Sequence, residues 1–180
     1  MGKIVAVSYV TLDGVHENPA WSGPYFNEEL SEWQGDNLRA ADVMLLGRKT
    51  YEGFRDSWPA MEAETGWFGE KMNAMPKRVA TRTLTKPEWN ATFIEGDVAD
   101  AVRELKAGPE SILINGSAEL INYLTKDKLI DEYRIMVYPV VVGHGGKLWA
   151  DDTEVNLTLT SSFVTKTGVA VLTYVPADRA

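Results

Sequence analysis

The amino-acid sequence predicts an α/β fold of three layers: a mainly parallel central sheet, helices on both faces, and an antiparallel edge at the C-terminal end. Two observations lead to this prediction. Strand-like and helical segments alternate through the first two thirds of the chain, and only strands follow. Residues 111–115 form a nearly continuous apolar run, which is typical of a strand buried on both faces. No repeat or linker interrupts the 180 residues, so we expect a single domain over residues 1–180.

Composition narrows the function classes. The chain is 44% hydrophobic and 24% charged, as globular proteins are, and its apolar runs are shorter than the roughly 20 residues of a membrane helix. A net charge of −8 disfavours nucleic-acid binding, which needs a basic field. The absence of cysteine excludes disulfides and cysteine nucleophiles and makes the cytoplasm the expected location. An anionic ligand would need local positive charge, for which the candidates are Arg48, Lys49, Lys77, Arg78 and Arg82.

The first strand is expected at residues 3–12, which are rich in Val, Ile and Tyr. We interpret this run as a central strand and not as a signal peptide. It ends at Asp13-Gly14, which is either a simple turn or an aspartate at the position where open α/β sheets bind ligands. The irregular loop that follows, residues 15–24, is long enough to be functional.

Residues 25–41 are predicted to form a helix with an apolar face. At 100° per residue, Tyr25, Leu30 and Trp33 share that face, and Glu29 lies among them. Two interpretations of Glu29 stay open. In the first, the CH₂ groups of Glu29 pack on the apolar face while its carboxylate reaches water. In the second, the carboxylate points into a cleft and has a raised pKa.

A strand–glycine–helix junction is predicted at Gly47. Residues 42–46 form a short apolar run, Gly47 permits a tight turn, and Thr50 begins a helical pattern. Arg48 and Lys49 place two cations beside the turn, while Thr50 offers a hydroxyl group and the free N–H groups of a helix start. This combination suits a phosphate group. The alternative is an ordinary junction whose two cations face solvent.

The middle of the chain continues the alternation. A short helix over residues 51–56 is predicted to stop near Trp58-Pro59, and a helix over residues 61–75 to be interrupted at Gly66 and Gly69. Further strands are expected at residues 77–81 and 91–95, and a further helix at residues 98–106.

A second junction of the same kind follows the buried strand at residues 111–115. Gly116 makes the turn and Ser117 is placed to cap a helix over residues 118–125. The free N–H groups of this helix start form a second candidate phosphate site.

The last third is predicted to be a strand at residues 133–142, a glycine-rich loop at residues 143–146, and a hairpin. Pro139 indicates an edge position or a bulge for the first of these strands. The hairpin joins strands at residues 155–164 and 169–175 through Lys166-Thr167-Gly168.

Five short motifs in this order resemble the dihydrofolate reductase fold. The resemblance is closest to bacterial proteins grouped with the reductase domain of the riboflavin-biosynthesis deaminase/reductase, and it covers roughly residues 3 to 175. The motifs are Thr11-Leu12-Asp13-Gly14, Gly47-Arg48-Lys49-Thr50-Tyr51-Glu52, Val79-Ala80-Thr81-Arg82-Thr83-Leu84, Ile114-Asn115-Gly116-Ser117-Ala118-Glu119-Leu120, and Leu129-Ile130-Asp131-Glu132 with Pro139-Val140-Val141-Val142-Gly143-His144-Gly145-Gly146.

The resemblance implies NADPH as the cofactor. The family's glycine pair before the pyrophosphate helix is Gly116-Ser117 in this chain. By position, the resemblance implies that the coenzyme phosphates contact Gly47, Arg48, Lys49 and Thr50, and that the 2′-phosphate contacts Thr81 and Arg82. It also implies that the pyrophosphate contacts Gly116, Ser117, Ala118, Glu119 and Leu120, and that the nicotinamide contacts Val7.

The resemblance also implies a hydride transfer to a small heteroaromatic substrate, and it leaves two carboxylates available for catalysis. Glu29 matches the helix carboxylate of dihydrofolate reductases, whereas Asp13 matches the first-loop aspartate of the riboflavin type. An aminouracil and a pterin therefore both stay open as substrate. Trp21, Tyr25 and Phe54 are expected to flank the substrate together with Asp13.

Other functions stay open beside the reductase. A protein with this fold can bind or sense NADP(H) without turnover, or its glycine turns can hold no ligand. His16 and His144 are candidate acid/base groups, but their separation in the sequence disfavours a metal site. Proteins of the riboflavin type commonly pair through their sheets, and the last third of this chain is rich in strands. Both observations favour a homodimer.

Overall fold

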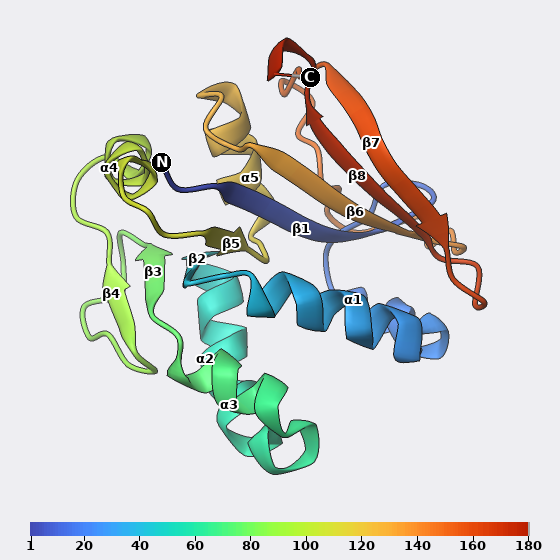
Figure 1. Ribbon diagram of the computed structural model, residues 1–180, viewed down its shortest axis with the longest axis horizontal. Coiled ribbons are helices and arrows are strands. Elements are labelled where there is room, and N and C mark those ends of the chain that lie inside the picture. Colours follow the sequence, from blue (N-terminus) through green and yellow to red (C-terminus); the bar gives the residue numbers. More distant parts are fainter. Residues whose placement is uncertain (180) are drawn as a thin grey trace.

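A computed structural model describes residues 1–179 and contains one eight-stranded sheet in the order β4-β3-β2-β5-β1-β6-β8-β7 (Figure 1). The six strands from β4 to β6 run parallel to their neighbours, and β8 and β7 are antiparallel. The predicted α/β class, the mainly parallel sheet and the antiparallel C-terminal edge are confirmed.

The elements have the following bounds. The strands are β1 Ile4–Thr11, β2 Val43–Gly47, β3 Lys77–Ala80, β4 Ala91–Phe93, β5 Ile112–Ile114, β6 Glu132–Tyr138, β7 Leu157–Val164 and β8 Ala170–Pro176. The helices are α1 Glu28–Arg39, α2 Arg48–Thr65, α3 Trp67–Ala74, α4 Val98–Ala107 and α5 Ala118–Lys126, with 3-10 turns η1 at Pro19–Tyr25 and η2 at Ala177–Arg179.

Strand β1 lies between β5 and β6 and is a central strand, as predicted. The sheet separates two hydrophobic layers of the core. Because successive side chains of a strand point to opposite faces, the residues of β1 alternate between the layers. Helices α1, α2 and α3 cover one face, whereas α4 and α5 cover the other (Figure 1). Val5, Val7 and Tyr9 pack on the first side, and Ile4, Ala6 and Val10 on the second.

Helix α1 begins three residues later than predicted, at Glu28. Asn27 is its N-cap, with an extended backbone and a side-chain oxygen that accepts a hydrogen bond from the Leu30 N–H at 3.1 Å. Tyr25 belongs to the preceding 3-10 turn, which occupies part of the loop predicted to be irregular. The local cap outweighs the apolar periodicity because it satisfies a backbone donor that the helix start leaves free.

Helix α2 does not stop near Pro59 but runs for 18 residues to Thr65, so the predicted break is wrong. Proline lacks the N–H that would bond to the carbonyl one turn earlier. Pro59 is exposed, so α2 forgoes this one hydrogen bond on its solvent side and continues. The chain breaks instead at Gly66, where φ is +56°, between α2 and α3.

Strand β6 ends at Tyr138, and it lies between β1 and β8 instead of at an edge. Pro139 therefore marks the end of the strand, not an edge position or a bulge. The true edge strands are β4 and β7. The predicted hairpin between β7 and β8 is confirmed, and Gly168 in its turn has a φ of +85°.

Lys77 is fully buried, so it cannot supply positive charge to a ligand as the sequence suggested. Its ammonium group donates a hydrogen bond to the Asn73 carbonyl at 2.9 Å and lies 3.8 Å from the centre of the Trp89 ring. Burial lowers the pKa of Lys77 to about 8. Within residues 1–179, no helix combines the length and the apolar character needed to cross a membrane.

Candidate active site at the carboxyl ends of the parallel strands

The two glycine junctions meet at the carboxyl ends of the neighbouring strands β2 and β5. The Gly47 N–H donates a hydrogen bond to the Gly116 carbonyl at 3.2 Å. A Cβ atom on Gly47 would lie 2.3 Å from Ser117 Oγ, so only glycine fits there without displacing Ser117. The peptide bond between Gly116 and Ser117 is cis. Two helix starts predicted separately from the sequence thus lie side by side.

The two helix starts differ in how their N–H groups are satisfied. Ser117 caps α5, since its Oγ accepts a hydrogen bond from the Leu120 N–H at 3.3 Å. Gly47 caps α2 without any side-chain hydrogen bond, and no acidic residue lies in the first turn of α2. The first N–H groups of this long helix therefore present an uncompensated positive end at the surface. Such an end binds anions.

The first two residues of α2 are cations. The Arg48 guanidinium lies 2.9 Å from a carboxylate oxygen of Glu52 one turn along α2 and is partly exposed. Lys49 is exposed, and the Thr50 hydroxyl oxygen lies 2.9 Å from the point where a Cβ on Gly116 would be. The structure thus gathers Gly47, Arg48, Thr50 and Gly116 into one cradle, which we call the phosphate cradle.

The neighbouring strand β3 brings a further cation to this edge. Ala80 pairs with Gly47, so Thr81 and Arg82 follow β3 beside the cradle. Thr81 Oγ1 accepts hydrogen bonds from the N–H groups of Thr83 and Leu84 at 3.3 and 3.1 Å, which fixes the turn after the strand. Arg82 is exposed and has no hydrogen bond or ion pair among the described residues.

Asp13 is bound to the glycine-rich loop that follows β6. Its carboxylate accepts hydrogen bonds from the Thr11 hydroxyl at 2.5 Å, the Gly143 N–H at 2.8 Å and the Val142 N–H at 3.3 Å. The Thr11 hydroxyl, and after it the Gly143 N–H, lower the pKa of Asp13 because they stabilise the ionised form. Asp13 is thus an ionised anchor between two loops, and it has no proton to donate to a substrate at neutral pH.

Glu29 is anchored in the same way, to the β7–β8 hairpin. Its carboxylate accepts hydrogen bonds from the Lys166 N–H and the Asn27 amide, both at 2.8 Å. The Lys166 N–H, and after it Asn27, lower the pKa of Glu29. The interpretation of Glu29 as a cleft carboxylate with a raised pKa is therefore wrong in its pKa.

Two of the three predicted substrate-flanking aromatics come together around Tyr138. The Trp21 and Tyr25 rings meet the Tyr138 ring edge-on, with centroid distances of 5.3 and 6.2 Å. Trp21 Nε1 and the Tyr138 hydroxyl are buried without a hydrogen-bond partner among the described residues. Phe54 packs elsewhere, edge-on against Trp58 at 6.4 Å. Val7 is buried in the same hydrophobic cluster as these rings.

His16 lies next to the phosphate cradle. Its Nδ1 lies 3.0 Å from the Tyr9 carbonyl oxygen, and its Nε2 lies 3.7 Å from the point where a Cβ on Gly116 would be. Burial lowers the pKa of His16. His144, by contrast, is exposed on the glycine-rich loop.

Comparison with known proteins places this geometry in a family. Residues 2–171 match the model of the RibD C-terminal domain. The chain belongs to the RibD C-terminal domain family. Its relative YyaP, an uncharacterised protein of Bacillus subtilis (strain 168), is 28% identical over 179 residues, covering 96% of this chain and 94% of YyaP.

Two solved structures share the fold of this RibD C-terminal domain protein. A putative riboflavin biosynthesis protein from Shewanella sp. PV-4 aligns with a TM-score of 0.76 and 20% identity, covering 97% of this chain and 98% of the other. A dihydrofolate reductase from Enterococcus faecalis, complexed with NADP(H) and RAB-propyl, aligns with a TM-score of 0.65 and 13% identity, covering 98% of both chains. The dihydrofolate reductase-like fold predicted from the sequence is therefore confirmed.

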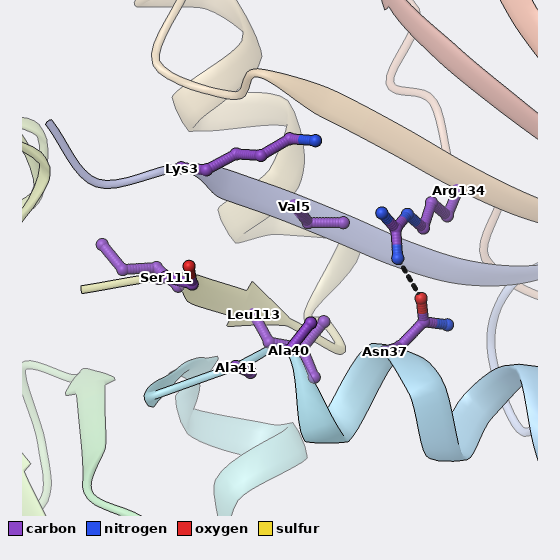
Figure 2. Close-up of a pocket in the computed structure, with 9 residues that line it drawn as sticks. Lys3, Val5, Asn37, Ala40, Ala41, Ser111, Leu113 and Arg134 are labelled. Atoms are coloured by element: carbon purple, nitrogen blue, oxygen red, sulfur yellow. Dashed lines mark hydrogen bonds between the residues drawn. The ribbon is translucent and has the colours of Figure 1, made fainter. Parts of the chain in front are cut away.

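Two surface hollows of this RibD C-terminal domain protein lie away from the cradle. One, of about 130 Å³, lies at the amino ends of β1 and β5, where Arg134 donates a hydrogen bond to Asn37 (Figure 2). The Arg134 guanidinium is also paired with Glu132 at 2.5 Å. The other, of about 600 Å³, lies between the end of α5 and η2. Neither is lined by a residue of the two glycine junctions.

Proposed function

We propose that this protein is an NADPH-dependent reductase that transfers a hydride to a small heteroaromatic substrate of the aminouracil or pterin type. The observation that supports it most is the uncapped start of α2 at Gly47, held against the second junction at Ser117. Family membership and the shared dihydrofolate reductase fold agree with this use of the cradle.

The residues of the cradle fit the phosphates of a dinucleotide. Helix α2 offers free N–H groups and its positive end, and the missing Cβ atoms of Gly47 and Gly116 let Ser117 and Thr50 lie against the two turns, which brings the two helix starts together. Arg48, Lys49 and Thr50 would contact the phosphates from α2, and Thr81 with Arg82 the 2′-phosphate. On the second junction, the pyrophosphate would contact Gly116, Ser117, Ala118, Glu119 and Leu120.

NADPH, when bound, supplies the hydride, and the protein binds, orients and shields the reactants. Val7 would lie under the nicotinamide, Trp21 and Tyr25 would enclose the substrate on one side, and Phe54 would border it from α2, where it packs against Trp58. Asp13 and Glu29 would act as ionised groups that fix the two loops bordering the site, because backbone N–H groups already hold both carboxylates. An ionised carboxylate can also accept a hydrogen bond from a substrate N–H group and so orient the ring.

A second candidate function is NADP(H) binding or sensing without turnover. The state of the two carboxylates favours it: the pKa of Asp13 and that of Glu29 are both lowered, so neither is a proton donor at neutral pH. This candidate predicts that NADPH binds but is not consumed with pterin, aminouracil or quinone substrates. Turnover of any of these that Asp13→Ala abolishes would reject it.

Titration of tryptophan fluorescence with NADPH and NADH tests coenzyme binding. Arg82→Ala should weaken NADPH binding by about tenfold or more, since a hydrogen bond to a charged group contributes about 1.5–3 kcal/mol, and should leave NADH binding unchanged. Lys86→Ala is the matched control, because Lys86 lies in the same segment and its side chain is 83% exposed. No saturable response to either nucleotide, or equal losses for both in Arg82→Ala, would contradict the proposal.

The C-terminal edge of the sheet is the proposed surface of a homodimer. Strand β7 has no neighbour on its outer side among the described residues, and Leu159, Phe163 and Val164 are 49%, 38% and 67% exposed. An unpaired edge with apolar side chains is prone to pair with another chain. Analytical ultracentrifugation of the native chain and of Phe163→Lys would test this; a native monomer at all concentrations would reject the dimer.

A further inference from the structure

The ring of His16 is fixed in place, but its outer nitrogen, Nε2, has no hydrogen-bond partner among residues 1–179. The backbone N–H of His16 donates a hydrogen bond to the Gly146 carbonyl at 2.8 Å, and Val15 forms a β-bridge with Lys147. The backbone beneath the ring is therefore held on two sides. The ring itself is held by the contact between Nδ1 and the Tyr9 carbonyl at 3.0 Å.

That contact determines the tautomer of the His16 ring in the free protein. A carbonyl oxygen only accepts hydrogen bonds, so Nδ1 must carry the proton and donate. Because the pKa of His16 is lowered, the ring is neutral at pH 7 and Nε2 carries a lone pair. This lone pair lies near the phosphate cradle: Nε2 and the Thr50 hydroxyl oxygen are both within 4 Å of the point where a Cβ on Gly116 would be.

An oxyanion in the cradle would meet this lone pair, and the contact would be repulsive unless Nε2 gained a proton. Moving the proton from Nδ1 to Nε2 would break the hydrogen bond to Tyr9. Both contacts are satisfied only by the imidazolium ion, which donates at both nitrogens.

We propose that His16 is a coenzyme-binding residue whose Nε2 donates a hydrogen bond to a phosphate oxygen of NADPH, and that it takes up one proton from solvent as the coenzyme binds. This rests on the proposed function, because it assumes a dinucleotide phosphate in the cradle. In this proton uptake one N–H bond forms at Nε2 of His16, no other covalent bond changes, and the proton comes from the buffer.

Other charged and titratable groups belong to the elements that pack around His16. On its own loop, the carboxylates of Asp13 and Glu17 are held by the N–H groups of Gly143 and Gly146, each at 2.8 Å. Helix α2 brings the cations Arg48 and Lys49, and β1 brings Tyr9, whose hydroxyl accepts a hydrogen bond from Gln34. The glycine-rich loop brings exposed His144 and Lys147. None of these has a hydrogen bond to His16 Nε2, so within the described residues none takes the place of the phosphate.

The pH dependence has a definite sign. In the complex, the phosphate raises the pKa of His16 above its value in the free protein. Between these two values, the complex holds one more proton than the free protein. NADPH affinity should therefore rise as pH falls through this window, by up to about tenfold per pH unit for one proton.

Isothermal titration with NADPH, in two buffers of different ionisation enthalpy at several pH values, tests the proposal. The native protein should take up close to one proton. His16→Ala should bind NADPH at least about tenfold more weakly at pH 6 and lose this uptake. His16→Gln retains a neutral N–H donor near the Nε2 position, so it should restore part of the affinity but not the pH dependence. His144→Ala is the control and should match the native protein.

The 2′-phosphate of NADPH also titrates near pH 6, but its contribution is common to all variants, and the difference between native and His16→Ala removes it. If NADPH binds natively and His16→Ala has the same affinity, proton uptake and pH profile, the inference about His16 is wrong and the proposed function stands. If NADPH binds to none of the forms, the proposed function fails as well.

Discussion

Replacing Gly47 with alanine tests how closely the two junctions approach each other. A Cβ at this position would lie 2.3 Å from Ser117 Oγ, 2.9 Å from Ser117 Cβ and 3.1 Å from the Ser117 backbone nitrogen. Carbon atoms pack without repulsion at about 3.5–4.0 Å, so the serine side chain and its backbone must both move.

The expected cost follows from three contributions. Overpacking a tight site costs about 1–3 kcal/mol, and alanine is a poorer N-cap than glycine by up to about 1 kcal/mol. The φ of Gly47 is −74°, which alanine adopts without strain, so the smaller entropy of the unfolded chain offsets about 0.4–1 kcal/mol. Gly47→Ala should therefore lower the free energy of unfolding by about 1–3 kcal/mol and weaken NADPH binding.

Urea denaturation measures this cost, since a lower midpoint with an unchanged slope reports stability alone. The matched control is Gly53→Ala in the same helix, where nothing lies within 4 Å of the new Cβ and about 0.5–1 kcal/mol of stabilisation is expected. In a Ser117→Gly background the two closest atoms are gone, so Gly47→Ala should cost at least about 1 kcal/mol less. Equal costs in both backgrounds would refute the close approach as the cause.

Two further predictions concern pH. Lys77 has a pKa of about 8 in the folded protein and about 10.5 when unfolded, so between these values the unfolded chain binds more protons and the free energy of unfolding should rise with pH. Urea denaturation at pH 8 and pH 10 should show a smaller rise in Lys77→Met than in the native protein. An identical rise would contradict the burial argument. Asp13 has a pKa lowered below 3.8, so its contribution is present above pH 3.8 and is lost as pH falls through the folded value. The difference in thermal stability between the native protein and Asp13→Asn should accordingly shrink below pH 3.8, whereas a constant difference would show that the anchored carboxylate is not its source.

The layers of the fold were predictable because they depend on patterns that the whole chain repeats. The continuous apolar run at residues 111–115 indicates a strand buried on both faces, and the structure places β5 between β1 and β2. Local breakers were less informative. Pro59 sits on the exposed side of α2 and costs the helix only one hydrogen bond, so tertiary packing carries α2 past it.

The candidate site was predictable only in parts. Each glycine junction is readable as a strand, a turn and a helix start, but the contact of Gly47 with Ser117 depends on β2 and β5 being neighbours, which no local pattern specifies. His16 was identified as a candidate acid/base group, yet its position beside Gly116 arises from the fold of the first loop onto Gly146. The sequence left two interpretations of Glu29 open, because the backbone N–H of Lys166 that lowers its pKa comes from a distant hairpin and leaves no trace in the sequence around Glu29.

The proposed function requires the NADPH phosphates to bind at the start of α2, against the second junction. Titration of the ¹⁵N-labelled protein with NADPH, followed through its amide signals, locates the bound coenzyme. The largest shifts should occur at Arg48, Lys49 and Thr50 and at the first residues of α5, with the signal of Arg82 moving for NADPH but not for NADH. Saturable shifts confined to other parts of the molecule, such as the β7–β8 hairpin, would contradict it.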